Sequence, residues 1–202
     1  RTICKSPVHS LLGSRDELIG AVDRATTYHW SNELRADRLG WLRGHILQGQ
    51  IIFPATGYLA LAVEAALQMA KGRPVQAITL EEVNFLKALR VDDETGASII
   101  VSLHVSWDDE QVVQARFTVD VYSTEETNRS TAAATMNITV QLGNPDEDLL
   151  PELASSPSPA MMTELDPGYV YSHLAELGYE YTGPFQRISR LRRSLGQALA
   201  EV

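Results

Sequence analysis

A long run of apolar positions with helical spacing follows Pro54. Proline is a common first residue of a helix, while Gly72 and then Pro74 close the pattern, so we expect the helix to end near Lys71. The apolar positions recur at intervals of three and four, as one face of an amphipathic helix requires: Tyr58, Leu61, Ala62, Ala65, Ala66 and Met69. Because half of them are alanine, a curved sheet could wrap closely around this helix.

Strand patterns occupy the chain after the helix. Four runs alternate or are rich in Val, Ile, Thr and aromatic residues: 77–91, broken near Asn84, 98–106, 112–122 and 132–142. Short connections of turn-forming residues separate these runs, which favours antiparallel pairing. Before the helix, residues 1–20 form a lead-in with turns and residues 25–31 form one more predicted strand. One helix with an antiparallel meander predicts an α+β fold.

The pattern changes after residue 142. Residues 143–165 mix proline, serine and acidic residues with little to pack, which is typical of a linker. Asp166 and Pro167 then predict a helix start, and Gly178 predicts its end. Strand-like runs follow at 185–195 and 197–202.

We therefore expect three parts: a first domain over residues 1–142, a linker over 143–165, and the beginning of a second, truncated domain over 166–202. The chain starts with Arg1 rather than methionine, and it finishes on a strand-like run with no turn or cap. The sequence looks like an excerpt from a longer polypeptide.

Composition and charge narrow the classes of partner. The net charge is −9, with 17 basic and 26 acidic residues and no basic block, which argues against a nucleic-acid surface. The single cysteine, Cys4, offers neither an internal disulfide nor a thiolate metal site, which fits a reducing compartment. No apolar run is long enough to cross a bilayer, and the N-terminus shows no signal-peptide pattern. We expect a cytoplasmic protein that does not bind a membrane or nucleic acid.

Candidate chemistry lies between His45 and Pro54. This stretch is uncharged apart from the histidine, which is a usable base near neutral pH, and it ends at the predicted helix start. The free N–H groups of that helix could hold a carbonyl oxygen as it gains negative charge. Removal of an α-proton beside a polarised carbonyl is the chemistry of enolisation and β-elimination. The same spacing also fits a histidine that is only hydrogen-bonded in a core or on a surface.

Three motifs in order carry a resemblance to a known family. His45, Gly49 and Pro54 match the HxxxGxxxxP motif of the dehydratase domains of polyketide and fatty acid synthases. Residues 9–13 resemble the HxLLG opening of these domains, and residues 178–185 resemble their GYxYGPxF segment with one additional threonine. The chain looks most like the highly reducing fungal polyketide synthases. The resemblance implies a hotdog fold, a long central helix wrapped by an antiparallel sheet, as the N-terminal part of a double hotdog.

The resemblance also implies roles for single residues. His45 matches the base that removes the α-proton, and the backbone N–H of Ala55 matches the group that holds the thioester carbonyl. Gly49 and Pro54 would shape the pocket, although Gly49 also fits an ordinary turn or bulge. The substrate-channel segment corresponds to Tyr181, Gly183, Pro184 and Phe185, which equally fit a turn that leads into a strand. The family's second catalytic group, an aspartic acid of the second hotdog, matches no residue of this sequence.

The implied reaction is elimination of water from a 3-hydroxyacyl chain carried on the phosphopantetheine of an acyl carrier protein. It needs no cofactor in this domain, and the sequence shows no metal-ligand spacing or cofactor fingerprint. The implied partners are the acyl carrier protein, other domains of the same synthase and a second copy in a homodimer. Two alternatives stay open, namely an inactive dehydratase-like structural or dimerisation module, and a stand-alone hotdog thioesterase or hydratase.

Overall fold

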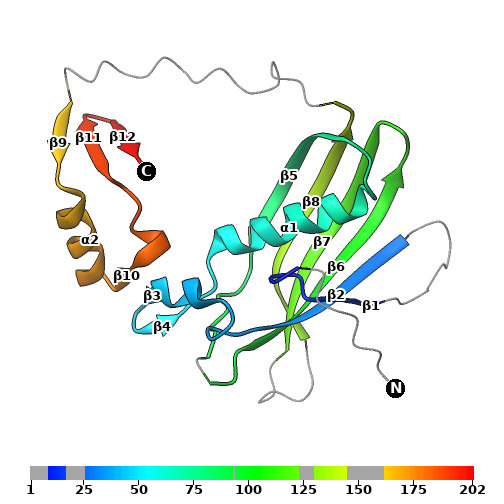
Figure 1. The fold of residues 1–202 in the computed structure, drawn as a ribbon, viewed down its shortest axis with the longest axis horizontal. Coiled ribbons are helices and arrows are strands. Elements are labelled where there is room, and N and C mark those ends of the chain that lie inside the picture. The colour runs from blue at the N-terminus through cyan, green and yellow to red at the C-terminus, as the bar shows by residue number, and fades with distance from the viewer. Residues whose placement is uncertain (1–8, 17–25, 93, 123–129, 145–161) are drawn as a thin grey trace. The chain divides into compact units, whose positions relative to one another are not determined.

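The computed structural model describes residues 9–16, 26–92, 94–122, 130–144 and 162–202 (Figure 1). The chain divides into two compact units. The first unit comprises Arg1–Leu39 and Phe53–Asp146, and the second comprises Gly40–Ile52 and Glu147–Val202. The segment from Gly40 to Ile52 thus groups with the C-terminal part of the chain, because it pairs with residues there, as described below.

An antiparallel six-stranded sheet forms the first unit, in the order β1-β2-β6-β7-β8-β5. Its strands are β1 (Ser14–Asp16), β2 (Thr26–Leu34), β5 (Val75–Phe85), β6 (Ala97–Asp108), β7 (Val112–Tyr122) and β8 (Ser130–Leu142). The four runs predicted after the helix are confirmed as β5 to β8, although β5 ends at Phe85, six residues before the predicted end of its run. The predicted break near Asn84 is a register shift between Glu81 and Asn84 in the pairing of β5 with β8.

Helix α1 (Ala55–Met69) packs on one face of this sheet (Figure 1). The predicted apolar face is confirmed, since all six residues named above are buried and Ala62, Ala65 and Ala66 have no exposed surface. Lys71 and Gly72, with φ of 54° and 80°, end the helix as predicted. One polar contact also joins helix and sheet, because Nε1 of Trp30 on β2 donates to Oε1 of Gln68 at 3.0 Å.

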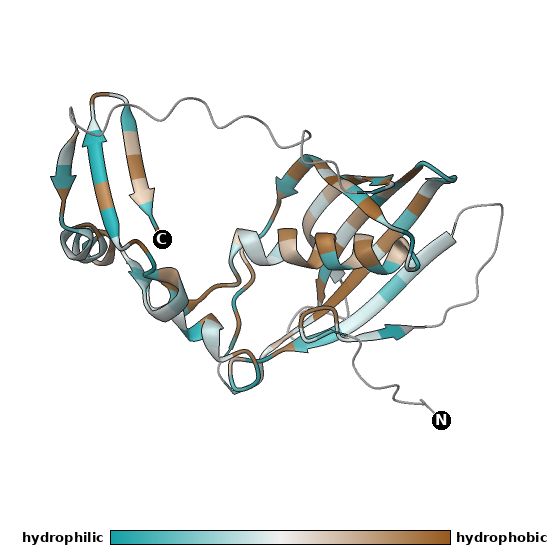
Figure 2. Cartoon of the chain, turned by 45° about the horizontal axis from the view of Figure 1, so that its top comes forward, coloured by the Kyte–Doolittle hydropathy of each residue, from teal (hydrophilic) through white to brown (hydrophobic). Residues whose placement is uncertain are grey.

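The core lies between α1 and the inward face of the sheet. Along β6 to β8, apolar and polar residues alternate, so that brown and teal bands follow each other in Figure 2. The largest fully buried side chains on these strands are Ile99, Leu103, Phe117, Met136 and Ile138. A long helix covered by an antiparallel sheet is the arrangement expected of a hotdog fold.

Short elements make up the second unit. They are the 3-10 helix η1 (Gly40–Gly44), β3 (His45–Leu47), β4 (Gln50–Ile51), β9 (Thr163–Leu165), α2 (Pro167–Glu176), β10 (Tyr179–Tyr181), the 3-10 helix η4 (Gly183–Phe185), β11 (Arg190–Ser194) and β12 (Gln197–Glu201). They form two three-stranded sheets, β10-β3-β4 and β12-β11-β9. None of the helices that the structure describes is long and apolar enough to cross a membrane.

The predictions for the linker and for the helix after it are confirmed in part. Asp166 caps α2 by accepting from the N–H of Gly168 at 3.0 Å, and Gly178 follows the helix with a φ of 88°, as predicted. Most of the predicted linker, residues 145–161, lies outside the described residues. Its last three residues, Thr163–Leu165, form strand β9, because β11 supplies hydrogen-bonding partners that no local pattern reveals.

The predicted strand over residues 185–195 begins later than expected. Gly183, with a φ of 54°, and Pro184 form the 3-10 helix η4, which ends at Phe185. The strand β11 then begins only at Arg190. The first residue of the predicted strand, Phe185, thus belongs to this 3-10 helix, and the strand begins five residues later than its residue pattern predicts.

The hairpin between β6 and β7 allows a test at acid pH. The Asp109 carboxylate accepts from the N–H groups of Val112 and Gln111 and from Nε1 of Trp107 at 2.7–2.8 Å, and these hydrogen bonds lower its pKa below the ordinary 3.8. A carboxyl whose pKa is lowered by folding stabilises the fold above its ordinary pKa, and this contribution is lost as the pH falls. We therefore expect Asp109→Ala to lower the urea midpoint of unfolding at pH 7 but to match the parent protein at strongly acid pH.

The control for this test is Asp109→Asn, whose amide oxygen still accepts N–H groups but does not titrate here. At pH 7, the urea midpoint of the Asn variant is expected to lie between those of the parent and of Asp109→Ala. A difference between parent and Asp109→Ala that stays constant down to strongly acid pH would contradict the hydrogen-bonded role of the carboxylate.

Candidate functional site

His45 opens strand β3, the first strand of a tight hairpin with β4. Leu47 pairs with Gln50, so the connection consists of Gln48 and Gly49, both with positive φ (51° and 74°). Positive φ at both central residues is characteristic of the two-residue hairpin turn whose twist matches that of the strands. Gly49 is therefore a turn glycine, one of the two alternatives that its sequence context left open. A Cβ atom at this position would meet no neighbour, so backbone conformation rather than space favours glycine.

Substitution of Gly49 tests this assignment. Gly49→Ala is expected to destabilise the unit by about 1–2 kcal/mol, because alanine disfavours the left-handed region. Gly49→Asn is the matched control, since asparagine visits this region more readily, and it should cost less. Urea denaturation measures both. Equal losses of unfolding free energy in the two variants would contradict this assignment, because the effect would then come from adding any side chain and not from the backbone angle.

One hydrogen bond fixes the imidazole of His45. Its Nδ1 lies 2.7 Å from the carbonyl oxygen of Ile52, while the N–H of Ile52 donates to the carbonyl of His45 at 3.2 Å. Because a carbonyl oxygen only accepts, Nδ1 carries the proton and Nε2 of the neutral ring carries the free lone pair. This leaves Nε2 as the basic atom. Ile52 was not among the predicted site residues, and no sequence signal marks a backbone carbonyl for this role.

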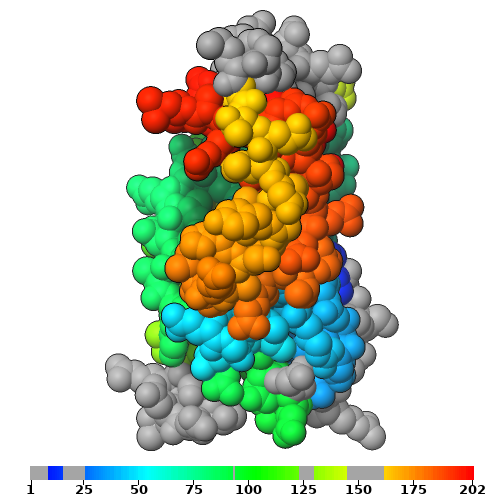
Figure 3. Space-filling view, turned by 90° about the vertical axis from the view of Figure 1, so that its left-hand side faces the viewer, coloured from blue at the N-terminus to red at the C-terminus, as the bar shows by residue number. Residues whose placement is uncertain are grey.

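The motif at residues 178–185 lies beside the motif that contains His45, because their strands pair. Strand β10 pairs antiparallel with β3, with Tyr181 directly opposite His45, and the N–H of Gln48 donates to the carbonyl of Gly178 at 2.7 Å. In Figure 3, the blue-to-cyan residues of Gly40–Ile52 lie against the orange residues of this segment. Residues far apart in sequence thus form one cluster around the histidine.

Aromatic rings surround His45 within this cluster. The centroid of its ring lies 5.3 Å from that of Tyr181 and 5.0 Å from that of Phe185, while Tyr181 and Phe185 lie 6.3 Å apart. Since the two aromatic rings are close to each other, they flank the imidazole together rather than enclosing it from opposite faces. Phe185 also packs against Trp41 of η1 at 6.2 Å, a neighbour that sequence reasoning missed.

Two members of the predicted channel segment have a backbone role. Gly183 and Pro184 lie in η4 and are exposed, and Gly183 has a φ of 54°, with nothing within 4 Å of the place that a Cβ atom would take. They turn the chain between Tyr181 and Phe185. The structure therefore brings His45, Tyr181 and Phe185 into ring contact, while Gly183 and Pro184 make the turn that allows it.

Pro54 and Ala55 belong to the first unit, at the start of α1. Pro54 precedes the helix with extended backbone angles, and the first turn has neither a side-chain cap nor an acidic residue. Phe53 anchors this start, because its N–H donates to the carbonyl of Leu89 at 2.8 Å and its ring lies 4.9 Å from that of Tyr58. Burial raises the pKa of Tyr58 to about 12. Of the N–H groups in this turn, that of Gly57 donates to the carbonyl of Pro54 at 2.9 Å, and neither the cap residue nor an acidic side chain of the turn accepts from the others.

The other predicted motif and the remaining histidines have ordinary partners. His9 closes a turn, accepting at Nδ1 from Leu11 N–H and at its carbonyl from Gly13 N–H. His29 contacts Ser102, His104 contacts Thr27, and His173 contacts Glu176. Among the residues that the structure describes, no group of three or more metal-ligating side chains comes together.

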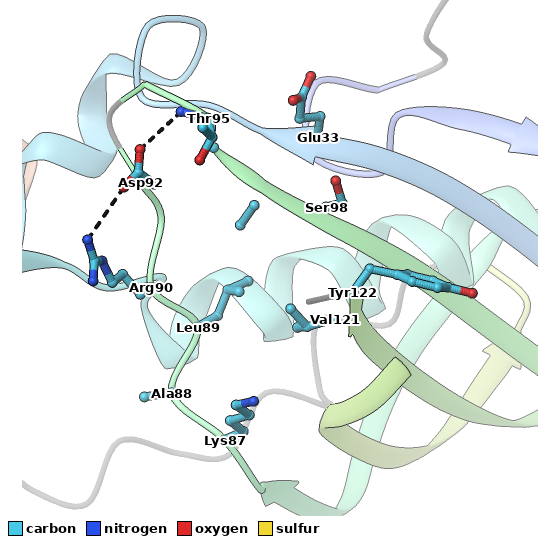
Figure 4. Close-up of a pocket in the computed structure, with 12 residues that line it drawn as sticks. Glu33, Lys87, Ala88, Leu89, Arg90, Asp92, Thr95, Ser98, Val121 and Tyr122 are labelled. Carbon is cyan, nitrogen blue, oxygen red and sulfur yellow. Dashed lines mark hydrogen bonds and ion pairs between the residues drawn. The ribbon is translucent and has the colours of Figure 1, made fainter. Parts of the chain in front are cut away.

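A cavity of about 760 Å³ lies in the first unit, between the segment after β5 and the start of β6 (Figure 4). Its charged lining includes an ion pair between Arg90 and Asp92, and Asp92 also accepts from the N–H groups of Glu94 and Thr95, which lowers its pKa. None of the residues predicted for the site lines this cavity. It therefore adds nothing to the arrangement around His45.

Family models match both parts of the chain. A model described as the polyketide synthase dehydratase domain matches residues 9–124, and one described as the polyketide synthase dehydratase N-terminal domain matches residues 150–202. The matched regions include all three motifs.

Relatives and solved structures agree with these matches. A hybrid PKS-NRPS synthetase of Acremonium sp. is 37% identical over 205 residues, and a highly reducing polyketide synthase of Calcarisporium arbuscula is 35% identical over 189 residues. The alignments cover 94% and 91% of this chain but only 5% and 7% of these relatives. The dehydratase domain of the CurF module of curacin polyketide synthase superposes with a TM-score of 0.77 at 21% identity, covering 95% of this chain and 65% of that domain.

These findings confirm the expected hotdog fold and the resemblance to fungal synthases. The family models span more than half of the sequence, and the motif residues they include comprise those gathered around His45, those at the start of α1 and the turn at residues 9–13. The chain belongs to the dehydratase domains of polyketide synthases.

Proposed function

We propose that this chain supplies the base of a dehydratase site that removes water from a 3-hydroxyacyl thioester to give a 2-enoyl thioester. His45 takes the α-proton at Nε2, the bond between the α-carbon and hydrogen supplies the electrons of the new double bond, and the β-hydroxyl leaves as water. The observation that carries the proposal is the hydrogen bond from Nδ1 of His45 to the carbonyl of Ile52. It leaves a free lone pair on Nε2 and fixes the orientation of the ring.

The surroundings of His45 support this role. Tyr181 and Phe185 place aromatic rings beside the imidazole, which restricts its rotation and gives the acyl chain an apolar surface to contact. An oriented base beside an apolar wall suits a substrate that carries a hydrocarbon chain. The hydrogen bond and the ring contacts together hold the base in place before substrate binds, so that less reorganisation is needed during proton transfer.

The start of α1 is proposed to hold the thioester carbonyl. Removal of an α-proton places negative charge on this oxygen, and a backbone N–H at a helix start stabilises such charge. By the family resemblance this group is the N–H of Ala55. The uncapped first turn, free of acidic side chains, supports the assignment, since a carboxylate there would compete for the donor.

The leaving hydroxyl needs a proton from a second group. By resemblance this is an aspartic acid of the second hotdog, which we place outside the present sequence; no acid of this chain is assigned the role. We further propose that the substrate arrives on the phosphopantetheine of an acyl carrier protein, that other domains of the same synthase are partners, and that the full synthase is a homodimer. We propose that this domain needs no cofactor, since the elimination requires proton transfers and cleavage of the C–O bond but no external oxidant or reductant.

The proposal is tested with a dehydratase domain that continues this sequence through its second hotdog. The domain is incubated with a 3-hydroxyacyl pantetheine thioester, and loss of water is followed by mass spectrometry. We expect turnover by this domain and none by the 202-residue chain alone, because the chain lacks the acid. Absence of turnover by the longer domain, folded and with its aspartate present, would favour a structural module. Turnover by the isolated chain would refute the assignment of the acid.

A further inference from the structure

Gly44, the residue before His45, is buried at the end of η1. A Cβ atom at this position would collide with the carbonyl oxygen of Thr182 and would lie 3.2 Å from Cδ2 of Phe185. The first of these neighbours is backbone, which yields far less readily than the end of a flexible side chain. The segment after β10 therefore approaches residue 44 more closely than any residue with a side chain allows.

Thr182 is held in this place by hydrogen bonds on both sides. Its N–H donates to the carbonyl of Gly44 at 2.9 Å, and its own carbonyl accepts from the N–H of Phe185 at 3.2 Å. The carbonyl that a side chain at residue 44 would displace is thus the one that anchors Phe185. Movement of Thr182 away from residue 44 would break one or both of these bonds and shift the aromatic ring.

This close approach determines what lies beside the imidazole. Tyr181, directly before Thr182, pairs with His45 across β10 and β3, and Phe185 follows on η4 with its ring 5.0 Å from the imidazole. We propose that Gly44 is a positioning residue: its lack of a side chain lets Thr182 approach, and this fixes Tyr181 and Phe185 against His45. The effect on catalysis rests on the proposed role of His45 as the base.

A positioning role differs from a merely structural one in what it changes. Displacement of the rings beside the base should lower kcat, since a misplacement of about 1 Å can cost about 10²-fold. It should also alter the NMR chemical shifts of the His45 ring protons, because these depend on the aromatic rings next to them. A loss of stability alone would change neither quantity in the molecules that remain folded.

The test compares Gly44→Ala with Gly40→Ala in the dehydratase domain that continues this sequence. Gly40 lies in the same short helix, and a Cβ atom there would meet nothing within 4 Å, so it is a matched control. We expect Gly44→Ala to lower kcat by about 10- to 100-fold with little change in KM, and to shift the His45 ring protons. Gly40→Ala should keep the kcat and the chemical shifts of the parent.

Several outcomes would overturn the proposal. A folded Gly44→Ala domain with the kcat and His45 shifts of the Gly40→Ala control is one. If Gly44→Ala does not fold, Phe185→Leu removes the ring while leaving the contact between Gly44 and Thr182, and parent-like kcat and shifts in this variant overturn the proposal. If the parent domain shows no dehydration, the proposed function fails, but the NMR comparison still decides whether Gly44 positions the rings.

Discussion

Replacement of His45 by alanine in a dehydratase domain that continues this sequence is expected to lower the rate of dehydration by about 10²- to 10⁴-fold, the usual contribution of a general base. The Nδ1 hydrogen bond to Ile52 leaves Nε2 as the only basic atom of the ring, and alanine offers no substitute. Conversion of a 3-hydroxyacyl pantetheine thioester under single-turnover conditions measures the loss. The unfolding midpoint should change little, because His45 is only partly buried.

The control for this experiment is His173→Ala. His173 is exposed on α2, and within the described part of the chain its side chain pairs with Glu176. Its removal should therefore leave the rate within about twofold of the parent. Added imidazole should restore part of the activity of His45→Ala if the missing group acts as a base. Parent-like rates in His45→Ala would remove this residue from the mechanism, whatever the rest of the domain does.

Trp30→Ala is expected to cost the first unit about 3–5 kcal/mol in free energy of unfolding, as is usual for a buried large aromatic residue. Trp30 is 1% exposed, and its indole N–H links β2 to Gln68 of α1. The substitution would open a cavity between helix and sheet and leave Oε1 of the half-buried Gln68 without the Trp30 donor. Chemical denaturation, read by circular dichroism, measures the effect.

Two further variants separate the contributions at Trp30. Trp30→Phe keeps most of the apolar volume but removes the N–H, so we expect a smaller loss of about 1–2 kcal/mol. Trp107→Ala is the exposed counterpart, since Trp107 is 58% exposed, and it should lose only about 1 kcal/mol through its hydrogen bond to Asp109. Equal losses at Trp30 and Trp107 would contradict the placement of Trp30 in the core between α1 and the sheet.

The main elements of the first unit, and helix α2 of the second, were largely predictable because their signals are local. The period of α1 and the alternation along β6 to β8 follow directly from which face each element buries, and Gly72 and Asp166 mark ends through their own backbone or side chain. Strand β9 escaped prediction for the opposite reason. Its three residues show no alternation, and only pairing with β11 makes them a strand.

For the candidate site, the sequence by itself determined which residues could carry the chemistry. The spacing of His45, Gly49 and Pro54 identified a base near a helix start, and the resemblance gave that base a reaction. These inferences need only residue types and intervals, since the chemistry of an imidazole and the geometry of a helix start are properties of the residues themselves.

Only the tertiary structure decided how His45 is oriented and surrounded. Its free nitrogen depends on a backbone carbonyl, and its aromatic neighbours arrive through pairing of β3 with β10. The proposed role of Gly44 also depends on the tertiary structure, because the carbonyl oxygen of Thr182 lies where a Cβ atom of residue 44 would collide with it. Long-range strand pairing and backbone contacts leave no periodic trace in a sequence, because they depend on which segments meet after folding and not on the order of residues within either one.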